Sequence, residues 1–206
     1  MRAARLLLVL AALVAASSPA AADIEGWDKT RWGMTQAEID RLYGDRLRRP
    51  QKPIRYHGAR AEAALADVMV GGQPFVVQFL LGDGGRLQQV LVERRRGQVS
   101  RDRFKAVVEE LRATLGPPAL ECLAGGDPPS GSYVWEGPVT TVHAALFGYS
   151  SDVLTVNPSR EIRRPVYRPR EEYRGLPLRP RILVRYHPTA RRDLFGRREG
   201  CRRFAG

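Results

Sequence analysis

The alternation of apolar and polar residues predicts a short helix at residues 34–44. Thr35 has a hydroxyl that can cap the helix, and Glu38 stands three residues later, which is the spacing of a capping box. Gly44 supplies a left-handed end. A helix of about eight residues is below the roughly 12 to 15 needed for stability alone. We therefore expect its apolar face to pack on a larger body; this face is Ile39, Leu42 and Tyr43.

A longer helix is predicted between Ser100, as the cap, and Gly116, where two prolines follow. Asp102 lies in the first turn, where a negative charge is favourable. The helix carries a continuous apolar stripe, namely Phe104, Val107, Val108, Leu111 and Leu115. This stripe predicts a second helix packed on the same body.

Three strand-like runs follow each helix, with alternating or continuous apolar residues between glycine- and proline-rich turns. The first three are residues 62–70, 75–81 and 87–94, and the second three are 133–135, 139–147 and 152–157. Residues 46–57 are interpreted as a basic connector and residues 119–132 as a loop. The pattern predicts an α+β fold: an antiparallel sheet with two helices on one face, built from tandem helix-plus-three-strand units at about 27–96 and 99–158.

The sheet face without helices is predicted to be partly polar and open to solvent. A half-covered sheet offers a partner a surface. The candidate residues on this face are Gln78, Gln88, Thr141 and His143.

The amino-terminal residues 1–22 have the features of a secretory signal peptide. Arg2 and Arg5 precede an apolar run, and Ala20 and Ala22 form a small-x-small cleavage site. We expect a periplasmic or secreted protein that begins at Asp23 after cleavage near Ala22. The α+β domain then covers residues 23–158, and residues 159–206 form an appended tail, partly disordered.

Positive charge is concentrated in that tail. Residues 23–158 hold 17 basic and 17 acidic residues, whereas residues 159–206 hold 15 arginines and 5 acids. Arginine forks onto phosphates, so the tail suits a polyanion such as anionic lipid or lipopolysaccharide rather than nucleic acid. The alternative is a solvated extension without a partner. Candidate contacts are Arg179, Arg181, Arg185, Arg191, Arg192, Arg197 and Arg198.

Residues 181–187 alternate in the tail and suggest a strand at the edge of the sheet. Two cysteines, Cys122 and Cys201, are present, and an exported protein can form a disulfide. Sequence leaves two alternatives: a bond that straps the tail to the domain, or two unpaired thiols.

Catalytic and metal-binding motifs are absent from the sequence. It contains no His-x-x-x-His pair, no Cys-x-x-Cys and no nucleophile elbow. We therefore expect no enzyme, no metal and no cofactor. A hydrolase that uses His143 is a third and weaker hypothesis.

Trp32, Gly33, Met34 and Thr35, followed by Glu38, resemble the Trp-Gly-Met-Thr opening of many small exported bacterial proteins. This opening, with strands after it, resembles the SmpA/OmlA-type outer-membrane-assembly lipoproteins and the β-lactamase-inhibitor-protein-like fold. The resemblance implies a protein that acts by binding other proteins. It transfers no binding residue, and the lipidated cysteine of the lipoproteins is missing here.

These observations lead to one principal hypothesis and one alternative. The principal hypothesis is a non-enzymatic exported protein that binds a protein or cell-envelope component through the open sheet face. The alternative is a polyanion-binding module that acts through the arginine-rich tail.

Overall fold

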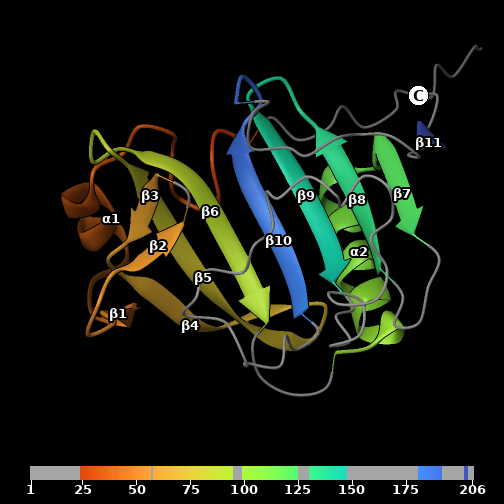
Figure 1. The fold of residues 1–206 in the computed structure, drawn as a ribbon, viewed down its shortest axis with the longest axis horizontal. Coiled ribbons are helices and arrows are strands. Elements are labelled where there is room, and N and C mark those ends of the chain that lie inside the picture. Colours follow the sequence, from red (N-terminus) through yellow and green to blue (C-terminus); the bar gives the residue numbers. More distant parts are fainter. Residues whose placement is uncertain are drawn as a thin grey trace, which may run out of the picture.

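The computed structural model describes residues 24–56, 58–94, 99–124, 130–147, 181–191 and 202–203. These residues form two α-helices, a short 3-10 helix and an 11-stranded antiparallel sheet (Figure 1). The predicted α+β class is thus confirmed. The helices are α1 (Gln36–Tyr43), η1 (Gly44–Arg46) and α2 (Arg101–Leu115). The strands are β1 (Leu47–Arg48), β2 (Ile54–Tyr56), β3 (Ala59–Ala61), β4 (Ala64–Val70), β5 (Gln73–Gly82), β6 (Leu87–Arg94), β7 (Leu120–Ala124), β8 (Ser130–Glu136), β9 (Thr140–Phe147), β10 (Arg181–Pro188) and β11 (Arg202–Arg203).

Both helices begin as the sequence predicts. The Thr35 hydroxyl accepts from the Glu38 amide at 3.3 Å, and a Glu38 carboxylate oxygen accepts from the Thr35 amide at 2.7 Å. The side-chain oxygen of Ser100 accepts from the Arg103 amide at 3.2 Å and caps α2. All five predicted stripe residues of α2 are buried. The prediction for α1 is wrong at Leu42, which is 36% exposed, whereas Ile39 and Tyr43 are buried.

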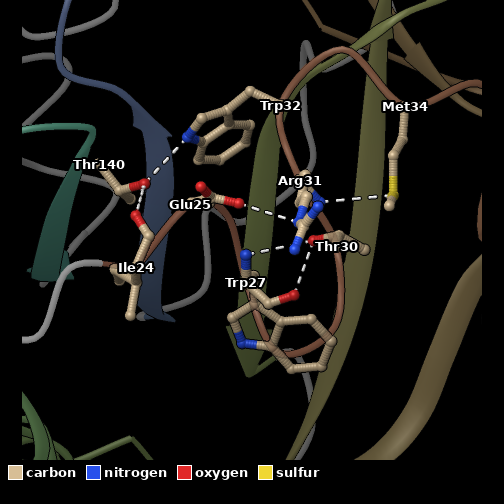
Figure 2. Close-up of polar contacts among 8 residues, drawn as sticks. All are labelled: Ile24, Glu25, Trp27, Thr30, Arg31, Trp32, Met34 and Thr140. Carbon is tan, nitrogen blue, oxygen red and sulfur yellow. Dashed lines mark hydrogen bonds and ion pairs between the residues drawn. The ribbon is translucent and has the colours of Figure 1, made fainter.

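The Trp-Gly-Met-Thr segment joins α1 to the sheet, and Figure 2 shows the polar contacts of Trp32 and Met34 within it. Trp32 Nε1 donates to Thr140 Oγ1 at 2.9 Å, and this hydroxyl donates to the carbonyl of Ile24. The backbone of Gly33 and Met34 exchanges hydrogen bonds with Leu87, at 2.9 and 2.7 Å. The motif is therefore accounted for by the attachment of α1 to β6.

One face of the sheet and the two helices enclose a single apolar core. Tyr43 of α1 stacks on Phe79 of β5 with ring centroids 5.2 Å apart, and Trp27 meets the same ring at 5.9 Å. From α2, Val107 is fully buried in the same cluster as Val142 of β9. Two helices too small to fold alone are thus stabilised by a shared surface.

The centre of the sheet is formed by a strand from the predicted tail. The strand order is β1-β4-β5-β6-β10-β9-β8-β7-β11, so β10 lies between β6 and β9 (Figure 1). Val184 pairs with Val92 on one side and with Ala144 on the other. A strand at 181–187 is confirmed, but its expected position at the edge is wrong. Ile182 and Val184 are buried in the main core. An edge strand of an appended tail would not contribute residues to that core.

Each helix precedes a group of three paired strands, β4 to β6 after α1 and β7 to β9 after α2, but β1, β2 and β3 also lie between α1 and β4, and the two groups are arranged differently. From β10 outward, the first group runs β6, β5, β4 and the second runs β9, β8, β7. All neighbouring pairs are antiparallel, so β4 and β7 point the same way, and both helices join one core. The second group thus has the reverse strand order of the first, while its strands keep the same direction and its helix packs on the same face of the sheet. Two groups related in this way are mirror images in layout, and no rotation superimposes one on the other. The sheet therefore gives no support to tandem units.

Several segments differ from their predicted state. The segment 119–132, expected to be a loop, contains β7 and the start of β8. Its Gly/Pro-rich composition favoured a loop, but β7 is stabilised by pairing with β8. The basic connector at 46–57 contributes β1 and β2. The strand predicted at 152–157 lies outside the described residues.

Candidate functional site

The sheet face opposite the helices carries a row of polar side chains on its central strands. Along β5, Phe79 points to the helices, so its neighbour Gln78 points to the other side. The same alternation places alternate residues of β6, β10 and β9 there. We call this surface the polar face; its members are Gln78, Gln89, Glu93, Thr141, His143, Arg181, Arg185 and His187.

The expectation that this face is open to solvent is wrong at its centre. Gln78 is 0% exposed and Thr141 is 4% exposed, while His143 and Gln88 are half-buried. Leu80, Leu91 and Leu183 are buried on the same side and form a second apolar cluster. The four residues predicted for partner binding are therefore part of the interior or its margin.

Glu93 connects three strands within the polar face. Its carboxylate accepts from Gln78 Nε2 at 3.4 Å and lies 3.4 Å from Arg181 Nη1. The Glu93 side chain is 4% exposed and that of Arg181 is 37% exposed. The ion pair sits at the boundary between interior and solvent, where it offsets the desolvation of the carboxylate.

A second group of polar side chains joins β9 and β10. His143 pairs in register with Arg185, and Thr141 pairs with His187. Burial, followed by the charges of Arg185 and His187, lowers the pKa of His143 to about 3. The ring is neutral near neutral pH and is a weak proton acceptor, so this lowered pKa does not favour the general base that a His143 hydrolase needs.

A group of hydrogen bonds lies at the end of the polar face where β10 leaves the sheet. Thr141 and Thr189 hydroxyls lie 3.0 Å apart, and Thr189 donates to the carbonyl of Gly137 at 2.8 Å. Arg191 donates to Gln88 Oε1 at 2.8 Å. Gln88 is thus engaged with the carboxyl-terminal chain. Further interactions, beyond these pairs, involve Glu93, His143, Arg181, Arg185, His187 and Arg191.

The candidate tail arginines fall into two groups. Arg181 and Arg185 are half-buried parts of β10, and Arg191 follows it. The remaining candidates lie outside the described residues: Arg179, Arg192, Arg197 and Arg198.

Cys122 lies in β7 and is disulfide-bonded. Its candidate partner, Cys201, lies outside the described residues. The residue after Cys201, Arg202, begins β11, which pairs with β7 at Glu121. The pairing of the two cysteines stays a prediction that this register favours.

Three residues of the polar face were missed by sequence reasoning, namely Gln89, Glu93 and His187. Glu93 is the acidic residue of the apolar run 87–94, and the alternation of that run points its side chain to the face of the sheet opposite that of Val92. His187 alternates with Tyr186 in the same way. The alternation is visible in the sequence, but it assigns these residues to one shared face only once β6 and β10 are known to be neighbours.

Comparison with known proteins gave no match to a family model, to a curated protein or to a solved structure. Within the described ranges, no helix is both long enough and apolar enough to cross a membrane. In the same part of the chain, no group of three His, Cys, Asp or Glu side chains is placed to hold a metal ion.

Proposed function

We propose that the chain is a non-enzymatic exported protein that binds a protein partner by adding a strand of that partner to β4. The sheet face first expected to bind is largely buried, so the contact is assigned to an exposed edge. The observation that carries the proposal is the outer side of β4. There β1 pairs only with Ala64 and Leu65, and no other described strand pairs with the remainder of that side.

Met69 is the exposed large apolar residue of this edge. Its side chain is 58% exposed, while Val68 and Val70 are half-buried against the core. Met69 pairs with Pro74 of β5. Because proline has no N–H, this cannot be a doubly hydrogen-bonded pair, and the N–H and C=O of Met69 point away from β5. Backbone groups so placed can accept an extended segment of another protein.

The hairpin that ends β4 holds the edge in position. Gly71 and Gly72 have φ of +56° and +69°, the left-handed values that a two-residue hairpin turn requires. The Gly71 amide donates to Glu110 of α2 at 2.6 Å. Gln73 Nε2 donates to the Arg103 carbonyl at 2.8 Å. An edge fixed against α2 presents its backbone groups with little entropy left to lose on binding.

Site-specific photo-crosslinking tests this function. A crosslinker at exposed Ala66, in the protein as exported by its own cell, should trap an extended segment of one partner. Substitution Met69→Pro removes the outward N–H and should reduce the adduct at least tenfold, whereas Met69→Ala, which keeps the backbone, should reduce it less.

A crosslinker at Val139, which is 38% exposed and outside β4, is the matched control. Equal adducts at Ala66 and Val139, or an undiminished adduct in folded Met69→Pro, would contradict strand addition. Thermal unfolding of each variant verifies that the fold is kept.

The arginines of β10 give little support to the alternative hypothesis, polyanion binding through the tail. Arg181 is engaged with Glu93, and Arg185 is half-buried beside His143. Any contact of this kind then depends on the candidate arginines outside the described residues.

A further inference from the structure

The end of the sheet that carries β1, β2 and β3 is strongly basic. Residues 46–60 contain six basic residues and no acidic one. All six are exposed. We call this surface the basic edge; its members are Arg46, Arg48, Arg49, Lys52, Arg55 and Arg60. The sequence from 23 to 158 is neutral as a whole, so the edge is a local concentration of charge.

The topology spreads these side chains along one border of the molecule. Leu47 and Arg48 of β1 lie against β4, and residues 54–56 of β2 lie against β3. Figure 1 shows these strands together at one end of the sheet, with β7 and β11 at the other. Within the described residues, two of the charges are matched: Arg49 pairs with Asp40 at 2.6 Å and Arg60 with Glu62 at 2.8 Å.

The other four basic residues have no ion pair in the part of the chain that the structure describes. Arg46 ends η1, Arg48 is in β1, Lys52 lies between β1 and β2, and Arg55 is in β2. They come from three successive elements and the connector between β1 and β2, so they are spread along the chain. A surface of this kind suits an extended array of anions better than a single small anion.

We propose that the basic edge binds the surface of a membrane that contains anionic phospholipids. Lipid headgroups present many phosphates in one plane, which separate arginines and lysines can contact at once. Protein strand addition is disfavoured here because β1 and β2 have two and three residues and Pro50 and Pro53 lie between them. The basic edge borders β4 but uses other residues than the free part of β4 and than the tail, so the proposal does not depend on the proposed function.

Vesicle co-sedimentation with the full mature chain tests the proposal. The probe is vesicles of phosphatidylcholine with 30% phosphatidylglycerol, compared with phosphatidylcholine alone. Each cation near such a surface contributes about a fivefold change in affinity, so the triple substitution Arg48→Gln, Lys52→Gln, Arg55→Gln should weaken binding on the order of 100-fold. Binding should also fall as salt rises from 50 to 500 mM.

A matched control removes the same charge elsewhere. Lys29, Arg101 and Lys105 are exposed and lie outside the basic edge. The triple Lys29→Gln, Arg101→Gln, Lys105→Gln variant should bind within about threefold of the unchanged protein. The double variant Arg48→Lys, Arg55→Lys keeps the charge and should also retain binding, which separates loss of charge from loss of fold.

Three results would overturn the proposal. The first is equal weakening by the two triple variants, which would assign binding to net charge. The second is binding to phosphatidylcholine alone with the same affinity. The third is tighter binding to duplex DNA than to anionic vesicles at the same salt concentration, which would assign the edge to nucleic acid.

Discussion

His143 is a titratable residue held between β10 and β8, with Arg185 beside it in register. Because burial and the neighbouring charges oppose a proton on the ring, the pKa of His143 is lowered from 6.5 to about 3. In the unfolded chain the ring returns to its ordinary value and binds a proton more readily. Acid therefore favours the unfolded state through this one residue.

A pH series measures this contribution. The stability that the protein gains from keeping His143 uncharged is complete above pH 6.5 and is lost as the pH falls from 6.5 toward 3. Between pH 7 and pH 5 the free energy of unfolding should drop by about 2 kcal/mol more in the unchanged protein than in His143→Gln. Urea unfolding at each pH supplies the values. Parallel curves for the two proteins would show that the His143 pKa is not lowered.

At the scale of elements, β10 determines how the rest of the sheet is joined. Its alternation identifies a strand in the sequence, but the same alternation fits an edge or a centre. Only the pairing with both β6 and β9 shows that the strand is central. A segment expected in an appendage is consequently part of the main core.

A substitution in β10 tests this position. Ile182 is 0% exposed in the main core, so Ile182→Ala should lower the free energy of unfolding by about 2 to 5 kcal/mol. Ala190→Ser, at an exposed residue just after the strand, should change it by less than about 0.5 kcal/mol. Denaturant unfolding distinguishes the two. A change at Ile182 as small as that at Ala190 would place the strand outside the core.

At the scale of the whole molecule, the described residues of the carboxyl-terminal chain join the sheet at two places. One is β10 in the centre, and the other is β11 on the outer edge of β7. Cys122 of β7 is disulfide-bonded. A bond from Cys122 to Cys201 would close a loop of 79 residue steps and fix the second attachment.

Thiol labelling tests the predicted bond. Denatured, unreduced protein should show no free thiols, and reduction should release two per chain. Cys201→Ser should lower stability by about 4 kcal/mol in the chain-entropy model. If unreduced protein labels at two thiols, the pairing is refuted; if the variant loses no stability, the strap has no energetic role.

The candidate sites show where reasoning from sequence ends. Alternation correctly grouped Gln78, Thr141 and His143 on one face, yet their exposure was predicted wrongly. A period of two gives the side to which a residue points, and it carries no information about what lies on that side. The basic connector was visible by composition, but its place on the sheet edge was not.

The sequence by itself determined the parts that depend on neighbours along the chain. These are the capped starts of α1 and α2, the buried stripe of α2 and the glycine turn after β4, because caps, turns and helical faces use contacts within a few residues. Tertiary structure alone decided the central place of β10, the reversed order of the second strand group and the burial of the polar face. Those features arise from pairings between distant segments, such as Val184 with Val92, for which local alternation allows many partners.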